Sequence, residues 1–121
     1  MTQTTQRTVS TPDGRVLAVE EAGDPDGLPV LVHNGTPNSR HLYGPTVADA
    51  GARGLRIIGY DRPGYGGSSP QPGRTVASCA ADVRAICAAL GIGRLVTWGI
   101  SGGGPHLLAT AALLPDLVAA A

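Results

Sequence analysis

The sequence predicts an α/β fold in which an antiparallel hairpin leads into a mostly parallel sheet with flanking helices. Short apolar runs typical of buried strands occupy residues 29–33, 55–60 and 95–99. Segments with helical patterning lie between and after these runs. Strands that alternate with helices favour parallel pairing, with helices covering both faces of the sheet.

The hairpin is predicted from two weakly alternating segments on either side of a turn. Gln6 to Ser10 forms the first segment and Arg15 to Glu21 the second. Between them stands Thr11-Pro12-Asp13-Gly14, whose residue types favour a tight turn. This pattern predicts two antiparallel strands ahead of the parallel part of the sheet.

Three helices are expected. A weak one spans Thr46 to Ala52, and a stronger one begins with Thr75 as its N-cap and ends at Gly91. The third runs from about Gly102 to Leu113 and stops before Pro115. The stronger helix has an apolar stripe along one face, and Ser78, Asp82 and Arg84 fall outside that stripe. The stripe consists of Val76, Cys79, Ala80, Val83, Ile86, Cys87 and Leu90.

The charge of the chain excludes some classes of partner. The 121 residues include nine acidic and nine basic residues, so the formal net charge is zero. This balance gives no reason to expect nucleic acid or an anionic membrane as a partner. All the basic residues are Arg, and without a Lys a P-loop nucleotide site is excluded. No G-x-G-x-x-G occurs either, which argues against a dinucleotide-binding module.

Metal, membrane and secretion signals are also missing from the sequence. On one helix, Cys79 and Cys87 would lie about 12 Å apart along the axis, too far for a disulfide, and we interpret them as core residues. The three histidines are scattered and show no zinc spacing, so we expect no metal and no cofactor. Met1 to Arg7 is polar, and no apolar run approaches about 18 residues, so we expect a cytoplasmic protein.

The motif that indicates chemistry is Gly99-Ile100-Ser101-Gly102-Gly103. It matches G-x-S-x-G, the nucleophile elbow, in which a serine sits on a strained turn from strand to helix. Small residues are needed two positions away from Ser101, because a Cβ there would collide across the turn. The free N–H groups at the start of the following helix point to where an oxyanion would develop. A glycine turn without chemistry is the alternative reading of the same five residues.

A second loop fits the same chemistry. His33-Asn34-Gly35-Thr36-Pro37 directly follows the first buried strand. An oxyanion hole needs two backbone N–H donors, one after the nucleophile and one from such a loop. Gly102 occupies the first position. Pro37 has no N–H, so Thr36 is the expected second donor.

Three blocks together make the chain resemble the α/β-hydrolase superfamily. They are His33 to Pro37, Tyr60-Asp61-Arg62-Pro63-Gly64-Tyr65-Gly66, and Trp98 to Gly104, in the order typical of that family. The resemblance covers roughly Gln6 to Leu114. It is greatest to the proline-iminopeptidase-like and esterase-like branch. Asn34 departs from the pattern, since relatives often have a second histidine there.

The resemblance implies a serine hydrolase that cleaves an ester or a small amide of a small-molecule substrate through an acyl-enzyme. Ser101 would be the nucleophile, and Gly102 and Thr36 would supply the oxyanion-hole N–H groups. Haloalkane dehalogenases and epoxide hydrolases share the fold but place Asp at the elbow, so Ser101 argues against both of those chemistries. The substrate itself cannot be inferred from the sequence.

The remaining catalytic groups are not found after Ser101 in the expected order. In this fold an acid and then a histidine follow the serine. Here His106 precedes Asp116, and His106 would lie about 7 Å along the elbow helix. We therefore interpret residues 1–121 as an incomplete hydrolase domain that ends after the elbow helix, with Val118 to Ala121 starting another strand. Alone, it should be inactive and poorly behaved, with Leu95 to Gly99 left as an apolar edge.

Other polar residues receive structural interpretations. We expect His33 to fix the oxyanion loop by hydrogen bonding and His41 to face substrate or solvent. Asp61 ends a strand near the site, but the resemblance gives it a role in loop shape. Tyr43 and Trp98 fit packing better than a pocket. A non-catalytic interaction protein that retains the elbow as a relic remains the alternative function.

Overall fold

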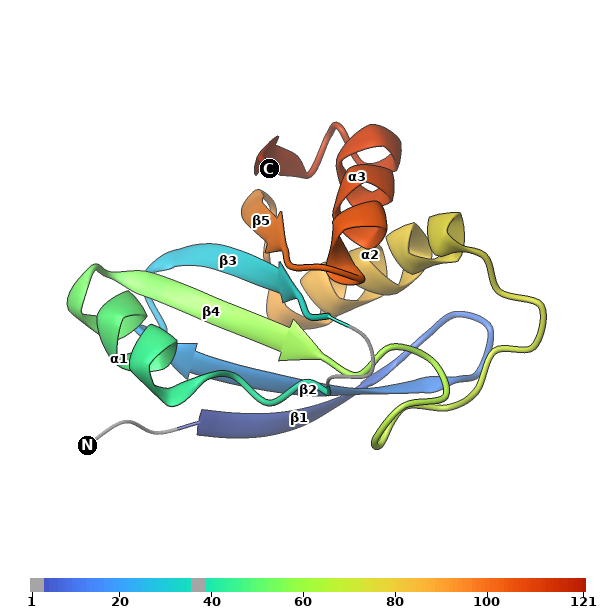
Figure 1. The fold of residues 1–121 in the computed structure, drawn as a ribbon, viewed down its shortest axis with the longest axis horizontal. Coiled ribbons are helices and arrows are strands. Elements are labelled where there is room, and N and C mark those ends of the chain that lie inside the picture. The colour runs from blue at the N-terminus through green and yellow to red at the C-terminus, as the bar shows by residue number, and fades with distance from the viewer. Residues whose placement is uncertain (1–3, 36–38) are drawn as a thin grey trace.

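The computed structural model describes residues 4–35 and 39–121. Within these residues it contains one six-stranded sheet in the order β1-β2-β4-β3-β5-β6 (Figure 1). The strands and helices are β1 Thr4–Ser10, β2 Val16–Gly23, β3 Leu28–His33, α1 Gly44–Ala52, β4 Leu55–Tyr60, a 3₁₀ turn Val76–Ser78, α2 Cys79–Leu90, β5 Leu95–Gly99, α3 Gly103–Leu113 and β6 Val118–Ala120.

The N-terminal hairpin is confirmed. β1 and β2 pair antiparallel from Thr4 opposite Ala22 to Ser10 opposite Val16. The turn closes with a hydrogen bond from the Thr11 N–H to the Arg15 carbonyl (2.9 Å), and Gly14 adopts a φ of 82°. β2 then pairs antiparallel with β4, which joins the hairpin to the rest of the sheet.

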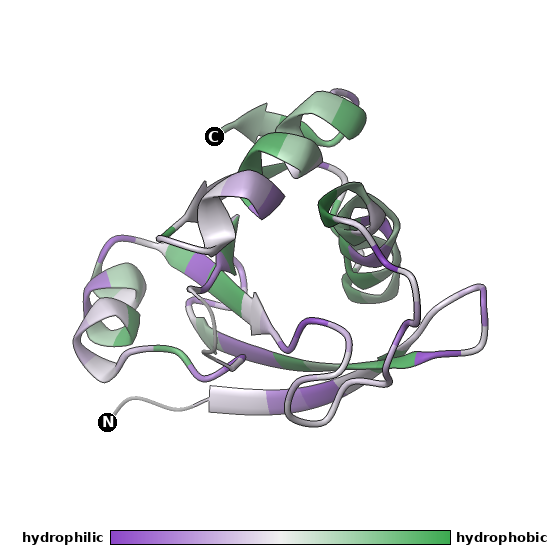
Figure 2. Ribbon diagram, turned by 45° about the vertical axis from the view of Figure 1, so that its right-hand side comes forward, coloured by the Kyte–Doolittle hydropathy of each residue, from purple (hydrophilic) through white to green (hydrophobic). Residues whose placement is uncertain are grey.

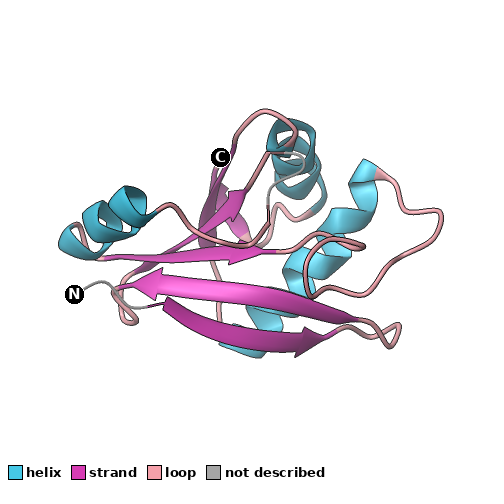
Figure 3. Ribbon diagram, turned by 60° about the horizontal axis from the view of Figure 1, so that its bottom comes forward, coloured by secondary structure: helices cyan, strands magenta, loops and turns pink. Residues whose placement is uncertain are grey.

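The parallel part of the sheet is confirmed as well. β3 lies between β4 and β5 and runs parallel to both. From Val30 to His33 its side chains are buried on both faces, because Leu31 packs with α2 and the C-terminal segment while Val32 packs with α1. α1 covers one face of the sheet, and α2 and α3 cover the other (Figure 3). This explains why the central strands are continuously apolar.

The first residues of the helices differ from those predicted: α1 begins earlier, and α2 and α3 begin later. Thr75 caps a 3₁₀ turn through a reciprocal capping box with Ser78, and the α-helix begins only at Cys79. Val76 is consequently 41 % exposed and does not belong to the buried stripe. α1 begins at Gly44 rather than Thr46, with Pro45 in its first turn, and α3 begins at Gly103. Gly91 ends α2 with a φ of 70°, as predicted.

Asp82 was predicted to lie off the apolar stripe of α2, and that interpretation is wrong. The side chain is fully buried, and its Oδ1 accepts a hydrogen bond from Arg15 Nη2 at 2.7 Å. Arg15 also binds Asp13, so the turn end of the hairpin is tied to α2 by an ion-pair cluster. A buried carboxylate is tolerated here because its charge is paired.

The predicted bare edge at β5 is also corrected. β6 adds to β5 in parallel, with Leu95 opposite Val118 and Val96 opposite Ala120. The expectation that a strand starts at Val118 is thus confirmed. Because β6 is short, pairing on that side stops at Val96, and residues 97–99 of β5 pair only with β3 in the described part of the chain.

α3 is apolar around most of its circumference. Figure 2 shows hydrophobic colours over most of this helix and over the C-terminal end of the chain. Its inner side is buried, but Leu108 is 69 % exposed and Leu113 is also exposed. Across the described ranges, no helix is long and apolar enough to cross a membrane.

Candidate active site

Ser101 lies between the end of β5 and the start of α3, as the elbow motif predicts. Its φ is 52°, and it is the only non-glycine residue with a positive φ among residues 4–35 and 39–121. The left-handed conformation is strained for a non-glycine residue, so contacts with the surrounding residues must stabilise it. Such strain is typical of a serine presented at a nucleophile elbow.

The two outer glycines of the motif are required by close backbone contacts. A Cβ on Gly103 would lie 1.9 Å from the His33 carbonyl oxygen, and a Cβ on Gly99 would lie 2.6 Å from the Gly103 carbonyl oxygen. Real Cβ atoms do not approach backbone oxygens so closely, so a larger residue at Gly99 would push the two arms of the turn apart, and one at Gly103 would push α3 away from β3. The predicted collision across the turn is therefore confirmed at Gly99, whereas Gly103 is required by its close approach to β3.

The residues predicted to form an oxyanion hole lie only partly within the described part of the chain. Gly102 directly precedes α3, whose N-terminal end favours negative charge. Thr36, the predicted second donor, lies outside the described residues, so convergence of its N–H with that of Gly102 stays a prediction. The strand ahead of the Thr36 loop is in place, because the Ile100 N–H donates to the His33 carbonyl at 3.1 Å.

The hydrogen bond predicted between His33 and the oxyanion loop is not found among the described residues, and Thr36 and Pro37 of that loop lie outside them. Within the described part of the chain, the ring of His33 bonds not to the loop that follows but to α3, with 3.0 Å between Nε2 and Thr110 Oγ1. The side chain is fully buried. The pKa of His33 is lowered to about 4, chiefly by burial and in smaller part by the nearby His106 and Arg62. His33 is therefore neutral at physiological pH.

The other two histidines are also bonded away from Ser101. His106 Nδ1 donates to the Gly102 carbonyl at 2.8 Å, within the first turns of α3. His41 is largely exposed, and its Nδ1 lies 3.1 Å from the Glu20 carboxylate. Asp116 forms an exposed ion pair with Arg84 at 3.0 Å. The geometry thus brings neither a histidine base nor this acid to Ser101.

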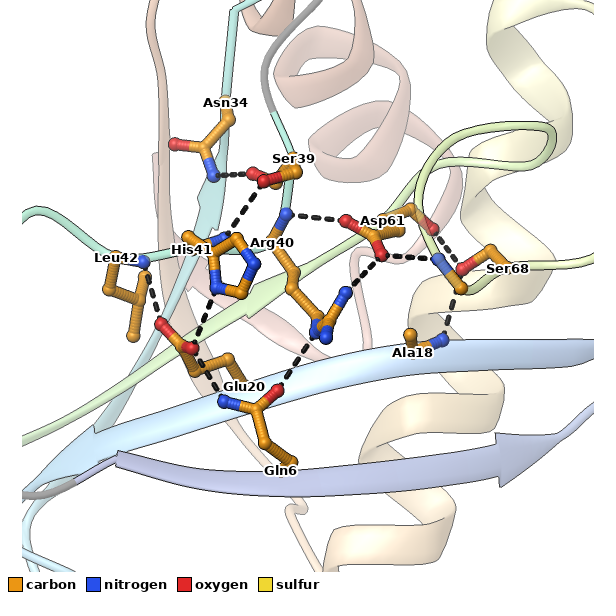
Figure 4. A network of polar contacts seen from close by, with 11 residues as sticks. Gln6, Ala18, Glu20, Asn34, Ser39, Arg40, His41, Leu42, Asp61 and Ser68 are labelled. Atoms are coloured by element: carbon orange, nitrogen blue, oxygen red, sulfur yellow. Dashed lines mark hydrogen bonds and ion pairs between the residues drawn. The ribbon is translucent and has the colours of Figure 1, made fainter.

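Asp61 shapes a loop, as interpreted from the sequence. Its buried carboxylate accepts hydrogen bonds from the Arg40 N–H (2.5 Å), the Arg40 side chain (2.6 Å) and the Gly67 N–H (2.9 Å). Figure 4 shows Asp61 joining the segment after Asn34 to the loop around Ser68. The Asn34 side chain donates to the Ser39 carbonyl at 2.7 Å. With its oxygens engaged in this way, Asp61 stabilises the loops beside the elbow.

The cysteines are core residues. Cys79 and Cys87 are buried and unbridged, and burial raises the pKa of both thiols, that of Cys87 to about 11. No group of three or more metal-binding side chains occurs in residues 4–35 and 39–121. Neither thiol has the lowered pKa of a reactive cysteine.

A cavity of about 380 Å³ lies at the opposite end of the sheet from Ser101. It is lined by residues of β1, β2 and β4, among them Arg7, Glu21 and Arg56. Arg56 is near the start of β4, whereas Ser101 follows the end of β5, and β4 and β5 run in the same direction. The cavity is therefore not a substrate pocket for the serine. Tyr43, ahead of α1, is exposed, and Trp98 on β5 is partly exposed.

The order of elements, the strained serine and its two packed glycines coincide with a family match. The family model described as alpha/beta hydrolase fold matches residues 29–121. The chain belongs to the α/β hydrolase fold family.

Relatives in this hydrolase family have different named activities. A non-heme chloroperoxidase from Streptomyces lividans is 38 % identical over 98 residues, which are 80 % of this chain and 36 % of the relative. An epoxide hydrolase from an endophytic Streptomyces superposes with a TM-score of 0.82 at 29 % identity, covering 95 % of this chain and 35 % of that one. A thermophilic esterase from Thermogutta terrifontis superposes with a TM-score of 0.80 at 31 % identity, covering 94 % and 43 %.

The coverage shows which part of the hydrolase fold is present. The chain spans between 18 % and 44 % of the length of the curated relatives it matches. It corresponds to the N-terminal portion of the hydrolase fold, with the hairpin, the first parallel strands and the elbow. Family membership fixes the fold but not the reaction, because the relatives' names describe several chemistries.

Proposed function

We propose that Ser101 is the nucleophile of a serine hydrolase that cleaves an ester or a small amide through an acyl-enzyme. The observation that carries this proposal is the positive φ of Ser101 at the junction of β5 and α3. A strained serine at a strand-to-helix turn presents its hydroxyl at the edge of the sheet where parallel strands end. Gly102 and Thr36 are the proposed oxyanion-hole donors.

The serine at the elbow favours acyl transfer over the epoxide opening named among the similar structures. Epoxide opening through an ester intermediate needs a carboxylate at the elbow, and this chain has a hydroxyl. A serine hydroxyl attacks a carbonyl carbon, and the N-terminal end of α3 would stabilise the oxyanion that forms. The esterase among the similar structures is in keeping with this choice.

The hydroxyl of Ser101 needs a base, and we propose that a histidine and an acid outside residues 1–121 supply it. All three histidines of this chain are engaged elsewhere, with Thr110, Glu20 and Gly102. The acid would orient the histidine, which would take the hydroxyl proton as the serine attacks. The substrate is proposed to be a small molecule, and no cofactor is needed for this chemistry.

Labelling with a fluorophosphonate probe tests the proposal, because the probe reacts only with an activated serine. Cells that express the protein are treated with the probe, and the tryptic peptide that begins at Leu95, after Arg94, is analysed by mass spectrometry. We expect the label on Ser101 and none in a Ser101→Ala strain.

Residues 1–121 purified alone provide the second arm. They are expected to remain unlabelled, because no base contacts Ser101. If the peptide is recovered from cells only in its unlabelled form, the chain is a non-catalytic relic and the proposal fails. Labelling of the purified chain would instead show that the base lies within it.

A further inference from the structure

We propose that His33 is a positioning residue of the elbow, clamping its two arms together so that Ser101 stays in its strained conformation. This inference rests on the proposed function for its catalytic meaning. The clamp joins the end of β3 to the residues before and after Ser101. It is built from the backbone of His33 on one side and from its ring on the other.

The backbone of His33 contacts both arms close to the serine. Its carbonyl oxygen accepts the Ile100 N–H at 3.1 Å, which ties down the residue before Ser101. Gly103 approaches the same oxygen so closely that a Cβ would lie 1.9 Å from it. One carbonyl group therefore fixes the entry to the turn and sets how near α3 can pack.

The ring of His33 reaches further along α3. Thr110 Oγ1 donates its only proton to the His106 carbonyl at 2.8 Å, so it must accept the bond from His33 Nε2 at 3.0 Å. This reasoning places the ring proton on Nε2. The bond joins residues 77 positions apart in sequence, and both residues are fully buried.

A second histidine extends the clamp back to the elbow. The ring of His106 stacks on the ring of His33, with 6.4 Å between the centroids. Tyr60 packs edge-on against the same His33 ring, with 5.9 Å between the centroids. His106 Nδ1 donates to the Gly102 carbonyl. His33 thus contacts Ile100 and Gly103 directly, and it reaches Gly102 through His106.

The strained backbone of Ser101 is the reason why contacts from His33 are needed at the elbow. A left-handed φ at a non-glycine residue persists only when neighbouring contacts outweigh its cost. β5 is paired only with β3 at residues 97–99, so the described sheet gives limited support to the turn from the other side. The bonds from His33 provide support at the point where the chain changes from strand to helix.

Two variants of Thr110 separate the clamp from ordinary core packing. Thr110→Val has nearly the same shape but no hydroxyl, and Thr110→Ser keeps the hydroxyl and loses a methyl group. Hydrogen exchange of the full 121-residue chain is followed by mass spectrometry for the elbow segment, residues 99–106, and for β2 as a reference. Thr110→Val loses the bond to His33 and the bond to the His106 carbonyl. We expect exchange at the elbow about tenfold faster or more in this variant, since the loss of even one buried hydrogen bond is enough for that factor. Thr110→Ser should stay close to the natural chain.

A double variant tests whether His33 acts through Thr110. If it does, adding His33→Leu to Thr110→Val should accelerate elbow exchange less than the two single effects combined. Faster exchange in β2 and the elbow by the same factor would mean general destabilisation and would overturn the proposal. So would equal effects of the Val and Ser variants, or elbow amides that are unprotected in the natural chain. None of these outcomes depends on labelling of Ser101, so failure of the clamp is distinguishable from failure of the proposed function.

Discussion

The charge state of His33 links the candidate site to the stability of the chain. The ring is buried among Thr110, Tyr60 and His106, and its pKa falls from 6.5 to about 4 on folding, chiefly through burial. The unfolded chain therefore binds one more proton than the folded chain between these two pH values. Stability must rise with pH across that window and fall on acidification.

We expect the free energy of unfolding to decrease by about 2 kcal/mol between pH 7.5 and pH 5 because of His33. Urea unfolding, followed by the fluorescence of the single tryptophan Trp98, measures this at each pH. His106, whose pKa is also lowered by burial, adds to the same trend. His33→Gln removes the titrating ring, and the pH dependence should become shallower than in the natural chain. An unchanged slope in that variant would contradict the assignment.

Sequence patterns indicated the candidate nucleophile more readily than its surroundings. The elbow motif at Ser101 could be recognised because Gly99 and Gly103 stand at fixed positions beside it, although the contact that requires Gly103 comes from His33 on β3. The bond from His33 to Thr110 spans 77 residues and leaves no pattern in either segment. Asp82 falls off the apolar stripe of the helix, and only the fold shows that it is buried and paired with Arg15.

At the level of strands and helices, the sequence predicted where elements lie better than where they begin. The hairpin and the three parallel strands follow from burial patterns that hold along each segment. The start of α2 was misplaced because Thr75 caps a 3₁₀ turn with the same residue types as an α-helix. The pairing of β6 with β5 depends on contacts between distant segments, which local patterns do not contain.

The first turn of α3 offers a matched pair of glycines. Gly103→Ala would press a Cβ against the His33 carbonyl oxygen, whereas the Cβ of Gly104→Ala would have no neighbour within 4 Å. We expect Gly103→Ala to lower the free energy of unfolding by about 3 kcal/mol or more through overpacking. Gly104→Ala should raise it by up to about 1 kcal/mol, because alanine favours a helix. Urea unfolding curves of the two variants check this, and equal stabilities would show that α3 can move away from β3.

In the molecule as a whole, one apolar surface near the elbow is uncovered and one strand end near it is unpaired on one side, among the described residues. The outer face of α3 exposes Leu108 and Leu113, and the end of β5 lacks a neighbour on the β6 side in the described residues. A helix whose outer face is apolar is normally covered by other parts of the protein. The same region lacks a base for Ser101, so the unsatisfied surface and the incomplete chemistry occur together. This coincidence supports the proposal that further polypeptide completes the site.

The open face of α3 also predicts how the isolated chain behaves. Contact between Leu108 side chains of different molecules would remove apolar surface from water, at about 1.5–3 kcal/mol for each fully buried leucine. We therefore expect residues 1–121 to associate at micromolar concentration and Leu108→Glu to shift them towards monomer, as measured by size-exclusion chromatography with light scattering. Tyr43→Glu makes the same change of charge at an exposed apolar residue ahead of α1 and serves as the control. If both variants dissociate the chain equally, net charge rather than the α3 face governs association, and a natural chain that is already monomeric would contradict the prediction.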